Sequence, residues 1–396
     1  MLTLIKNAHV YSPEPLGQCD VLIAGTKIVA IEKDLMLETS VSVRHLDGTG
    51  CIITPGFVDS LVHICGGGGE DGFASRTPEM QLSDATLAGI TTVVGALGTD
   101  AVGRTHTNLV AKAKGLKEEG LNAFCYTGSY HFPTPTLSQS VEHDIMFIEE
   151  MIGVGEVAIS DHRSSQPDAE QLATLASHAR VAGMLSKKRA PVSIHVGPAD
   201  THLSLLHQVA DNFDVPLNRF YPTHINRNKA LLDAGIRFAT AGGTIDFTTS
   251  TTEYDLAHGE YSAARALAYS LRAGVMASRL TMSSDGHASL PVFDEQNNLI
   301  GLEVGHESSL FTAFTEAVQQ HNVPLEQALM AITSNPADVL GIQKGRLVEN
   351  ADADLLLLDA DSLQLKHVFC NGQHMVSDGK PLVLGRFEKA AIAVSE

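Results

Sequence analysis

Eight short apolar segments alternate with amphipathic segments through the middle of this 396-residue chain. The apolar segments are mostly continuous, as is usual for strands buried on both faces of a parallel sheet. The segments between them repeat apolar residues at spacings of three and four, which indicates helices. Eight such repeats predict an α/β fold, a (β/α)8 TIM barrel. The apolar segments are GFVDSLVH, TTVVGAL, NAFCYTG, VAISD, VSIHV, RFYPTH, TIDFTTS and LTMSSD.

The two ends of the chain carry a different pattern. Short segments such as LTLIKNAHVY and VSVRHLDGTGCIITPG alternate apolar and polar residues between glycine and proline breaks. This period-two pattern predicts β-hairpins. We therefore expect two domains, a small β-sandwich built from residues 1–55 and 347–396 and a barrel formed by residues 56–346.

The composition limits the partners and the location. The formal net charge of −19 at pH 7 argues against nucleic acid, whose binding requires clustered Lys and Arg. The five cysteines form no CxxC pair, which favours a reduced intracellular protein. The first residues lack the charged and apolar regions of a signal peptide, and no apolar run is long enough to span a membrane. We expect a cytoplasmic protein with no membrane partner.

Residues that suit metal binding occur close to the expected strand ends. His63 closes the first strand, and His195 and His224 lie near the ends of the fifth and sixth. Asp285 ends the eighth, while Glu156 begins the fourth apolar segment, where a carboxylate is costly unless it is paired or bound to metal. Each residue alone has an ordinary structural explanation. Because barrel strand ends meet on one face, the five together predict a metal centre that suits zinc.

Further polar residues lie just beyond the strand ends. Arg163 and Arg227 suit a substrate with carboxylates, since guanidinium binds carboxylate through two parallel hydrogen bonds. Glu70, which follows four glycines, could hold an ammonium group. Asp285 could also take a proton from a water that the metal has made acidic. Tyr130, Thr99 and Ser289 share this placement.

Several stretches resemble the amidohydrolase superfamily and, within it, the isoaspartyl dipeptidases. They are GGGGE, TGSYHFP, AISDHRS, PTHINRN, GGTIDFTTS and SSDG. The resemblance covers nearly the whole chain and implies hydrolysis of dipeptides whose amide involves the aspartate side chain. It also implies one or two zinc ions per subunit, a small dipeptide as substrate and a homo-oligomer, typically an octamer.

The resemblance implies a role for each candidate residue. His195 and His224 would bind one zinc ion, while His63 and Asp285 would bind the other. Tyr130 would stabilise the carbonyl oxygen as it becomes negatively charged. The substrate contacts would come from Glu70, which would hold the α-ammonium group, from Arg163, Arg227 and Ser289, which would bind carboxylates, and from Thr99 and the backbone near Gly68.

The chain departs from the family pattern at two metal-binding positions. The first strand usually carries His-x-His, and Leu61 replaces one of these histidines. The fourth strand usually carries a carbamylated lysine that bridges both metals, and Glu156 stands at the aligned position. A carboxylate offers the same two bridging oxygens but has a shorter reach. Since GVGE is one residue longer than the family pattern, we expect a β-bulge that moves the strand inward.

These observations predict a zinc-dependent dipeptidase for β-aspartyl peptides. Because Leu61 cannot bind metal, we expect the ion at His63 and Asp285 to be held more weakly than the other. A related amidohydrolase that acts on N-acyl amino acids or cyclic amides is one alternative. A catalytically impaired oligomeric scaffold is another, which Leu61 supports and the retained ligands and arginines oppose.

Overall fold

The computed structural model describes residues 2–293 and 299–389. Each of the eight apolar segments forms a strand, as predicted. Strands β6 to β11 form a parallel sheet in sequence order, and β12 pairs in parallel with β13. These strands are β6 (Phe57–Val62), β7 (Ile90–Gly95), β8 (Asn122–Thr127), β9 (Met151–Ile159), β10 (Val192–Val196), β11 (Phe220–Thr223), β12 (Ile245–Thr248) and β13 (Leu280–Ser283).

Backbone hydrogen bonds join the end of β6 to the residues that follow β13. Asp285 N donates to Leu61 O at 3.1 Å, and His63 N donates to Gly286 O at 2.9 Å. The carboxyl ends of the first and eighth of these strands therefore lie side by side. This contact places His63 next to Asp285, although more than half of the chain separates them in sequence.

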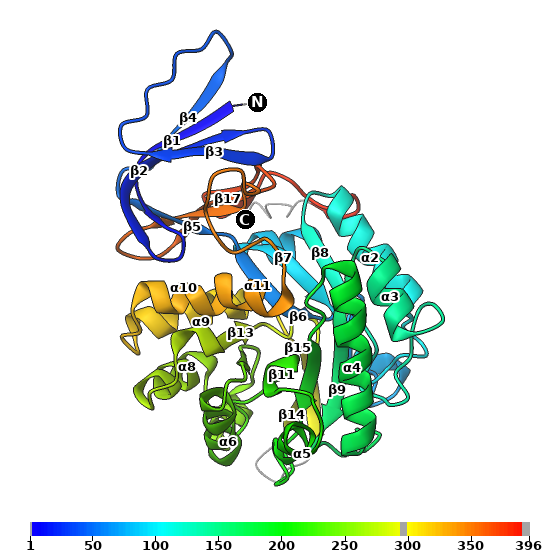
Figure 1. The fold of residues 1–396 in the computed structure, drawn as a ribbon. Coiled ribbons are helices and arrows are strands. Elements are labelled where there is room, and N and C mark those ends of the chain that lie inside the picture. The colour runs from blue at the N-terminus through cyan, green and yellow to red at the C-terminus, as the bar shows by residue number, and fades with distance from the viewer. Residues whose placement is uncertain (1, 294–298, 390–396) are drawn as a thin grey trace.

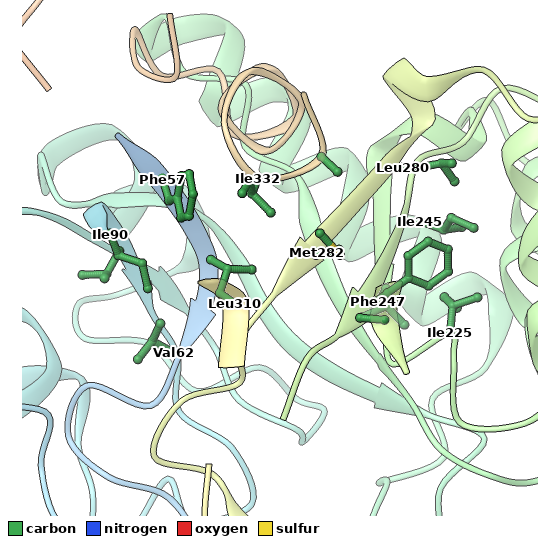
Figure 2. Packing of buried hydrophobic residues seen from close by; sticks show 14 of the residues in the cluster. Phe57, Val62, Ile90, Ile225, Ile245, Phe247, Leu280, Met282, Leu310 and Ile332 are labelled. Carbon is green, nitrogen blue, oxygen red and sulfur yellow. The ribbon is translucent and has the colours of Figure 1, made fainter. Parts of the chain in front are cut away.

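Helices lie on both sides of these strands, with α2, α3 and α4 on one side and α8, α9 and α10 on the other (Figure 1). Apolar side chains such as Phe57, Met282 and Leu310 fill the main core (Figure 2). No helix in the described part of the chain has the length and apolar character needed to cross a membrane. The helices are α1 (Leu82–Thr86), α2 (His106–Glu118), α3 (Val141–Phe147), α4 (Ala169–Ser186), α5 (Ser204–Asn212), α6 (Lys229–Thr240), α7 (Glu253–Ala257), α8 (Ala263–Arg272), α9 (Ser308–Gln319), α10 (Leu325–Ile332) and α11 (Ser334–Leu340).

Strands from the two ends of the chain form one nine-stranded sheet around a small core of their own. The blue strands of the N-terminal part and the orange β17 lie together in Figure 1. Residues 390–396 of the predicted β-sandwich lie outside the described residues, and the predicted domain boundaries stay a prediction. The strands are β1 (Leu2–Tyr11), β2 (Pro15–Ala24), β3 (Lys27–Glu32), β4 (Val43–Asp47), β5 (Cys51–Pro55), β16 (Leu355–Asp359), β17 (Leu365–Cys370), β18 (Gln373–Ser377) and β19 (Lys380–Pro381).

The hairpin predicted for VSVRHLDGTGCIITPG is wrong. Strands β4 and β5 both pair in parallel with β1, β4 with its first half and β5 with its second. The short turn between them lets the chain keep its direction along β1 instead of reversing. Gly48 N donates to Lys6 O at 2.7 Å, and a Cβ at Gly48 would lie 2.8 Å from that oxygen. The turn therefore requires glycine.

The sequence analysis also missed an antiparallel hairpin after β13, formed by β14 (Ser289–Phe293) and β15 (Leu299–Val304). Only residues 289–293 and 299–304 of it are described.

A buried cation connects the terminal sheet to the parallel strands. Lys344 Nζ lies 2.7 Å from Asp354 Oδ2 and 2.8 Å from both Asp352 Oδ2 and Asn122 Oδ1. Asn122 begins β8, and Asp354 directly precedes β16. The side chains of Lys344 and Asp354 are only 9% and 6% exposed, so water screens this pair weakly.

We expect Lys344→Met to lower the free energy of unfolding by about 3 kcal/mol, because it leaves the Asp354 carboxylate buried without its cation. Urea-induced unfolding measures the change. Lys229 forms an exposed pair with Asp233 and provides the control, since Lys229→Met should leave stability almost unchanged. Small and equal effects of the two substitutions would contradict the role given to Lys344.

Candidate metal centre

A β-bulge in β9 directs Glu156 away from the helices. Two residues, Gly155 and Glu156, lie opposite the single residue Ser193 of β10. Val154 and Val157, on either side of the bulge, both pack in the main core, and the extra residue leaves Glu156 free to point the other way. A Cβ at Gly155 would lie 2.6 Å from the Ser193 Cβ, so the bulge requires glycine. The bulge expected from the extra residue in GVGE is present.

Three histidines surround the Glu156 carboxylate. His195 Nδ1 lies 3.4 Å and His224 Nε2 3.6 Å from Glu156 Oε2. His63 Nε2 lies 3.6 Å from Glu156 Oε1 and 3.2 Å from Asp285 Oδ1. All five side chains are buried. The structure thus brings together the five residues predicted as metal ligands, with Glu156 between two pairs.

Hydrogen bonds fix the orientation of the imidazole rings. His195 Nε2 donates to Asp161 Oδ2 at 3.1 Å, and His63 Nδ1 donates to Ala96 O at 3.3 Å. Because a carboxylate or carbonyl oxygen only accepts, the nitrogen that faces it carries the hydrogen. In a neutral ring, the lone pair of His63 Nε2 then faces Glu156, while the lone pair of His195 Nδ1 faces both Glu156 and the Tyr130 hydroxyl. Metal-binding histidines are usually oriented in this way.

His224 is held in the same manner and is neutral. Its Nδ1 hydrogen-bonds to Thr248 Oγ1, which leaves Nε2 facing Glu156. Burial lowers the pKa of His224, and the nearby charge of Arg227 lowers it further, to about 4. The ring is therefore uncharged near neutral pH, which is the form that binds metal.

The unpaired oxygens of this centre fit a divalent metal ion. Both Glu156 oxygens and Asp285 Oδ1 are buried, without a hydrogen-bond partner among the described residues. Burial alone would raise the pKa of Glu156, but the surrounding imidazoles outweigh burial and hold this pKa below its ordinary value. Two ligands of one tetrahedral zinc ion lie roughly 3.4 Å apart, close to the observed separations between Glu156 and the histidine nitrogens.

Leu61 makes the centre asymmetric. Leu61 is 2% exposed and belongs to the same small core cluster as Val58, Val94 and Tyr126. The Oε2 side of Glu156 therefore has two imidazoles, whereas the Oε1 side has one imidazole and Asp285.

One pocket of about 550 Å³ contains most of the predicted site. Four of the five predicted metal ligands line it, while Glu156 is fully buried. The pocket also contains the remaining residues predicted from the sequence, which are Gly68, Glu70, Thr99, Tyr130, Arg163, Arg227 and Ser289.

Tyr130 and Arg163 stand at the edge of the metal centre. The Tyr130 hydroxyl lies 2.7 Å from His195 Nδ1, and burial raises the pKa of Tyr130, so the hydroxyl keeps its proton at neutral pH. Arg163 binds Asp161 through two hydrogen bonds of 3.0 and 2.8 Å. Asp161 therefore orients both Arg163 and His195. The sequence analysis missed this role, although the position of Asp161 just after the fourth strand was a usable signal.

The outer part of the pocket presents charges of both signs. Glu70 Oε1 accepts a hydrogen bond from Thr99 Oγ1 at 2.8 Å and lies 3.7 Å from Arg163 Nη1. A Cβ at Gly68 would lie 2.9 Å from the Ser289 Cβ, so only glycine allows the backbone to approach Ser289 this closely. An anion beside a cation suits a zwitterionic ligand.

Known proteins resemble this chain over most of its length. The β-aspartyl dipeptidase of Fervidobacterium islandicum AW-1, solved in complex with β-Asp-Leu, is 39% identical over 96% of this chain and 98% of its own, with a TM-score of 0.88. Another structure of that enzyme is 37% identical, covers 98% of this chain and 100% of its own, and has a TM-score of 0.89. The dihydroorotase of Lactobacillus johnsonii is 24% identical over 91% of this chain and 90% of its own. Residues 52–375 match the profile of the Amidohydrolase family, so the chain belongs to this family and has its TIM-barrel type of fold.

Proposed function

We propose that this chain hydrolyses β-aspartyl dipeptides with the help of zinc. The observation that carries the proposal is the pairing of Glu70 with Arg163 in the same pocket as the metal centre. The 39% identity to a β-aspartyl dipeptidase solved with β-Asp-Leu supports it. The proposal includes a closed barrel of eight parallel strands. In such barrels the active site lies at the carboxyl ends of the strands.

In this proposal Glu156, His195 and His224 hold one zinc ion. His63 and Asp285 would hold a second ion, which would be bound more weakly. Bound zinc lowers the pKa of water and polarises a carbonyl group.

Two residues of the chain handle the reacting atoms. Asp285, which lines the pocket, takes the proton from the attacking water and passes it to the leaving amine. Tyr130 donates a hydrogen bond to the amide carbonyl oxygen as negative charge develops there.

The charged residues of the pocket match the three charges of a β-aspartyl dipeptide. Glu70, held by Thr99, binds the α-ammonium group. The two carboxylates contact Arg163, Arg227 and Ser289, and the backbone at Gly68 completes this part of the pocket.

Hydrolysis of a cyclic amide such as dihydroorotate is a second candidate function. The similarity to dihydroorotases over about nine-tenths of the chain favours it. Dihydroorotate carries one carboxylate and no ammonium group, and Glu70 would then face no cation of the substrate.

A panel of substrates separates the two candidates. We expect kcat/KM for β-Asp-Leu to exceed the values for α-Asp-Leu and dihydroorotate by roughly 100-fold or more, because only β-Asp-Leu places the three charges correctly around its scissile amide. Chromatography of the products measures all three rates. Arg227→Lys should mainly raise KM, since it keeps the charge and loses the bidentate geometry. Faster cleavage of dihydroorotate would replace our first proposal with the second.

The role of Glu156 can be tested by removing its charge. Glu156→Gln keeps the size of the side chain, and we expect zinc content and kcat to fall together because the central anion is lost. Elemental analysis and activity assays measure the two quantities. The control is Glu316→Gln, which alters a carboxylate that, among the residues the structure describes, pairs with His321 and Ser262. Full zinc content and wild-type rates in Glu156→Gln would show that Glu156 is not a ligand.

The effect of Leu61 can be tested by restoring a histidine. We expect the ion at His63 and Asp285 to leave first on dialysis against a mild chelator, because this side of the centre lacks an imidazole. Leu61→His should then raise the fraction of protein with two zinc ions at limiting zinc. Leu61→Met, which keeps an apolar side chain of similar volume, is the control. Two tightly held ions in the wild-type protein would contradict the expectation.

A further inference from the structure

A second group of metal-ligating side chains lies outside the pocket. Asp84 belongs to α1, His287 follows β13, and Glu307 directly precedes α9. Their ligand atoms all lie within 4.8 Å of one another. His287 Nε2 is 3.4 Å from Asp84 Oδ2 and 3.6 Å from Glu307 Oε1. The three side chains thus have the spacing found at the Glu156 centre.

The His287 ring points its free nitrogen at the two carboxylates. Its Nδ1 lies 3.0 Å from Pro78 O, which only accepts, so Nδ1 carries the hydrogen. In a neutral ring the Nε2 lone pair then faces two carboxyl groups. A proton or a metal ion between the three groups would satisfy these facing atoms.

The separations favour the metal ion. Both 3.4 and 3.6 Å exceed the usual range of an N–H···O hydrogen bond, so a proton on His287 Nε2 pairs poorly with either carboxylate. Two ligands of one tetrahedral zinc ion lie roughly 3.4 Å apart.

Buried, unpaired atoms give an independent observation. His287 is 6% exposed and Glu307 is 1% exposed. Within the described residues, His287 Nε2 and Glu307 Oε1 have no hydrogen-bond partner. Such atoms are costly unless something binds them.

The surrounding chain accommodates these side chains. A Cβ at Gly286 would collide with Glu307 Oε1, so glycine at this position makes room for the carboxylate. Asp84 Oδ2 also accepts a hydrogen bond from Gln81 N at 2.7 Å, which fixes its direction. The Asp84 side chain is 38% exposed, which leaves access for water as a further ligand.

We propose that Asp84, His287 and Glu307 bind a divalent transition-metal ion of the zinc type, separate from the catalytic centre. The ion would tie α1 and the start of α9 to the segment between β13 and β14, which carries Asp285. Its role is structural, since none of its three ligands lines the pocket.

The main test counts zinc. Protein stripped by a chelator is titrated with zinc, and bound metal is measured by elemental analysis. We expect wild-type protein to bind one equivalent more than His287→Gln. His321→Gln is the matched control, because His321 faces one carboxylate, Glu316, at 3.1 Å, and its zinc content should equal that of the wild type. Equal zinc content in the wild type and His287→Gln would overturn the proposal and leave a proton between the groups.

A second pair of variants covers the case in which His287→Gln does not fold. Asp84→Asn changes a partly exposed position, and we expect it to weaken one equivalent of zinc roughly tenfold or more. His287→Cys loaded with cobalt should show a thiolate-to-cobalt charge-transfer band that cobalt-loaded wild-type protein lacks. Unchanged zinc binding in Asp84→Asn together with no such band would also overturn the proposal. Zinc content and the cobalt spectrum are measured without substrate. A negative result would therefore reject the second metal site without contradicting the proposed dipeptidase activity.

Discussion

The candidate centre depends on one buried carboxylate and on the bulge that aims it. Glu156 is fully buried, and its two oxygens face different partners, His195 and His224 on one side and His63 on the other. If β9 kept its regular alternation from Val154 onward, Glu156 would face the helices as Val154 does, and the bulge reverses this direction. Gly155 permits the bulge because a Cβ there would collide with β10. The geometry of the centre therefore follows from a single irregularity of the backbone.

Each of the three imidazole rings turns one nitrogen toward this carboxylate. A hydrogen bond at the second ring nitrogen fixes that orientation. Asp161, Thr248 and Ala96 provide the holding oxygens, and none of them follows from the pattern of metal ligands in the sequence. Asp161 has a further effect, since it also binds Arg163 and so links the metal centre to the charged part of the pocket. A substitution at Asp161 would alter both parts of the site together.

Much of the fold and of the candidate site could be predicted because strongly apolar strands ending in polar residues stand out in a sequence. The parallel pairing of β4 and β5 with β1 could not be predicted. Alternation of apolar and polar residues indicates a strand but does not identify the strand it pairs with. The hairpin of β14 and β15 was missed because it lies outside the repeating pattern that predicts the barrel. The group around His287 was missed because Asp84 and Glu307 do not lie at the ends of the predicted strands. The octamer and the cytoplasmic location stay predictions.

The most direct test of the account is a crystal structure of the zinc-loaded protein in which zinc is located by its anomalous scattering. We predict an ion about 2.0–2.2 Å from a Glu156 oxygen and from the facing nitrogens of His195 and His224. Zinc bound elsewhere in the pocket, with both Glu156 oxygens left without a metal, would contradict the central claim that this buried carboxylate organises the site.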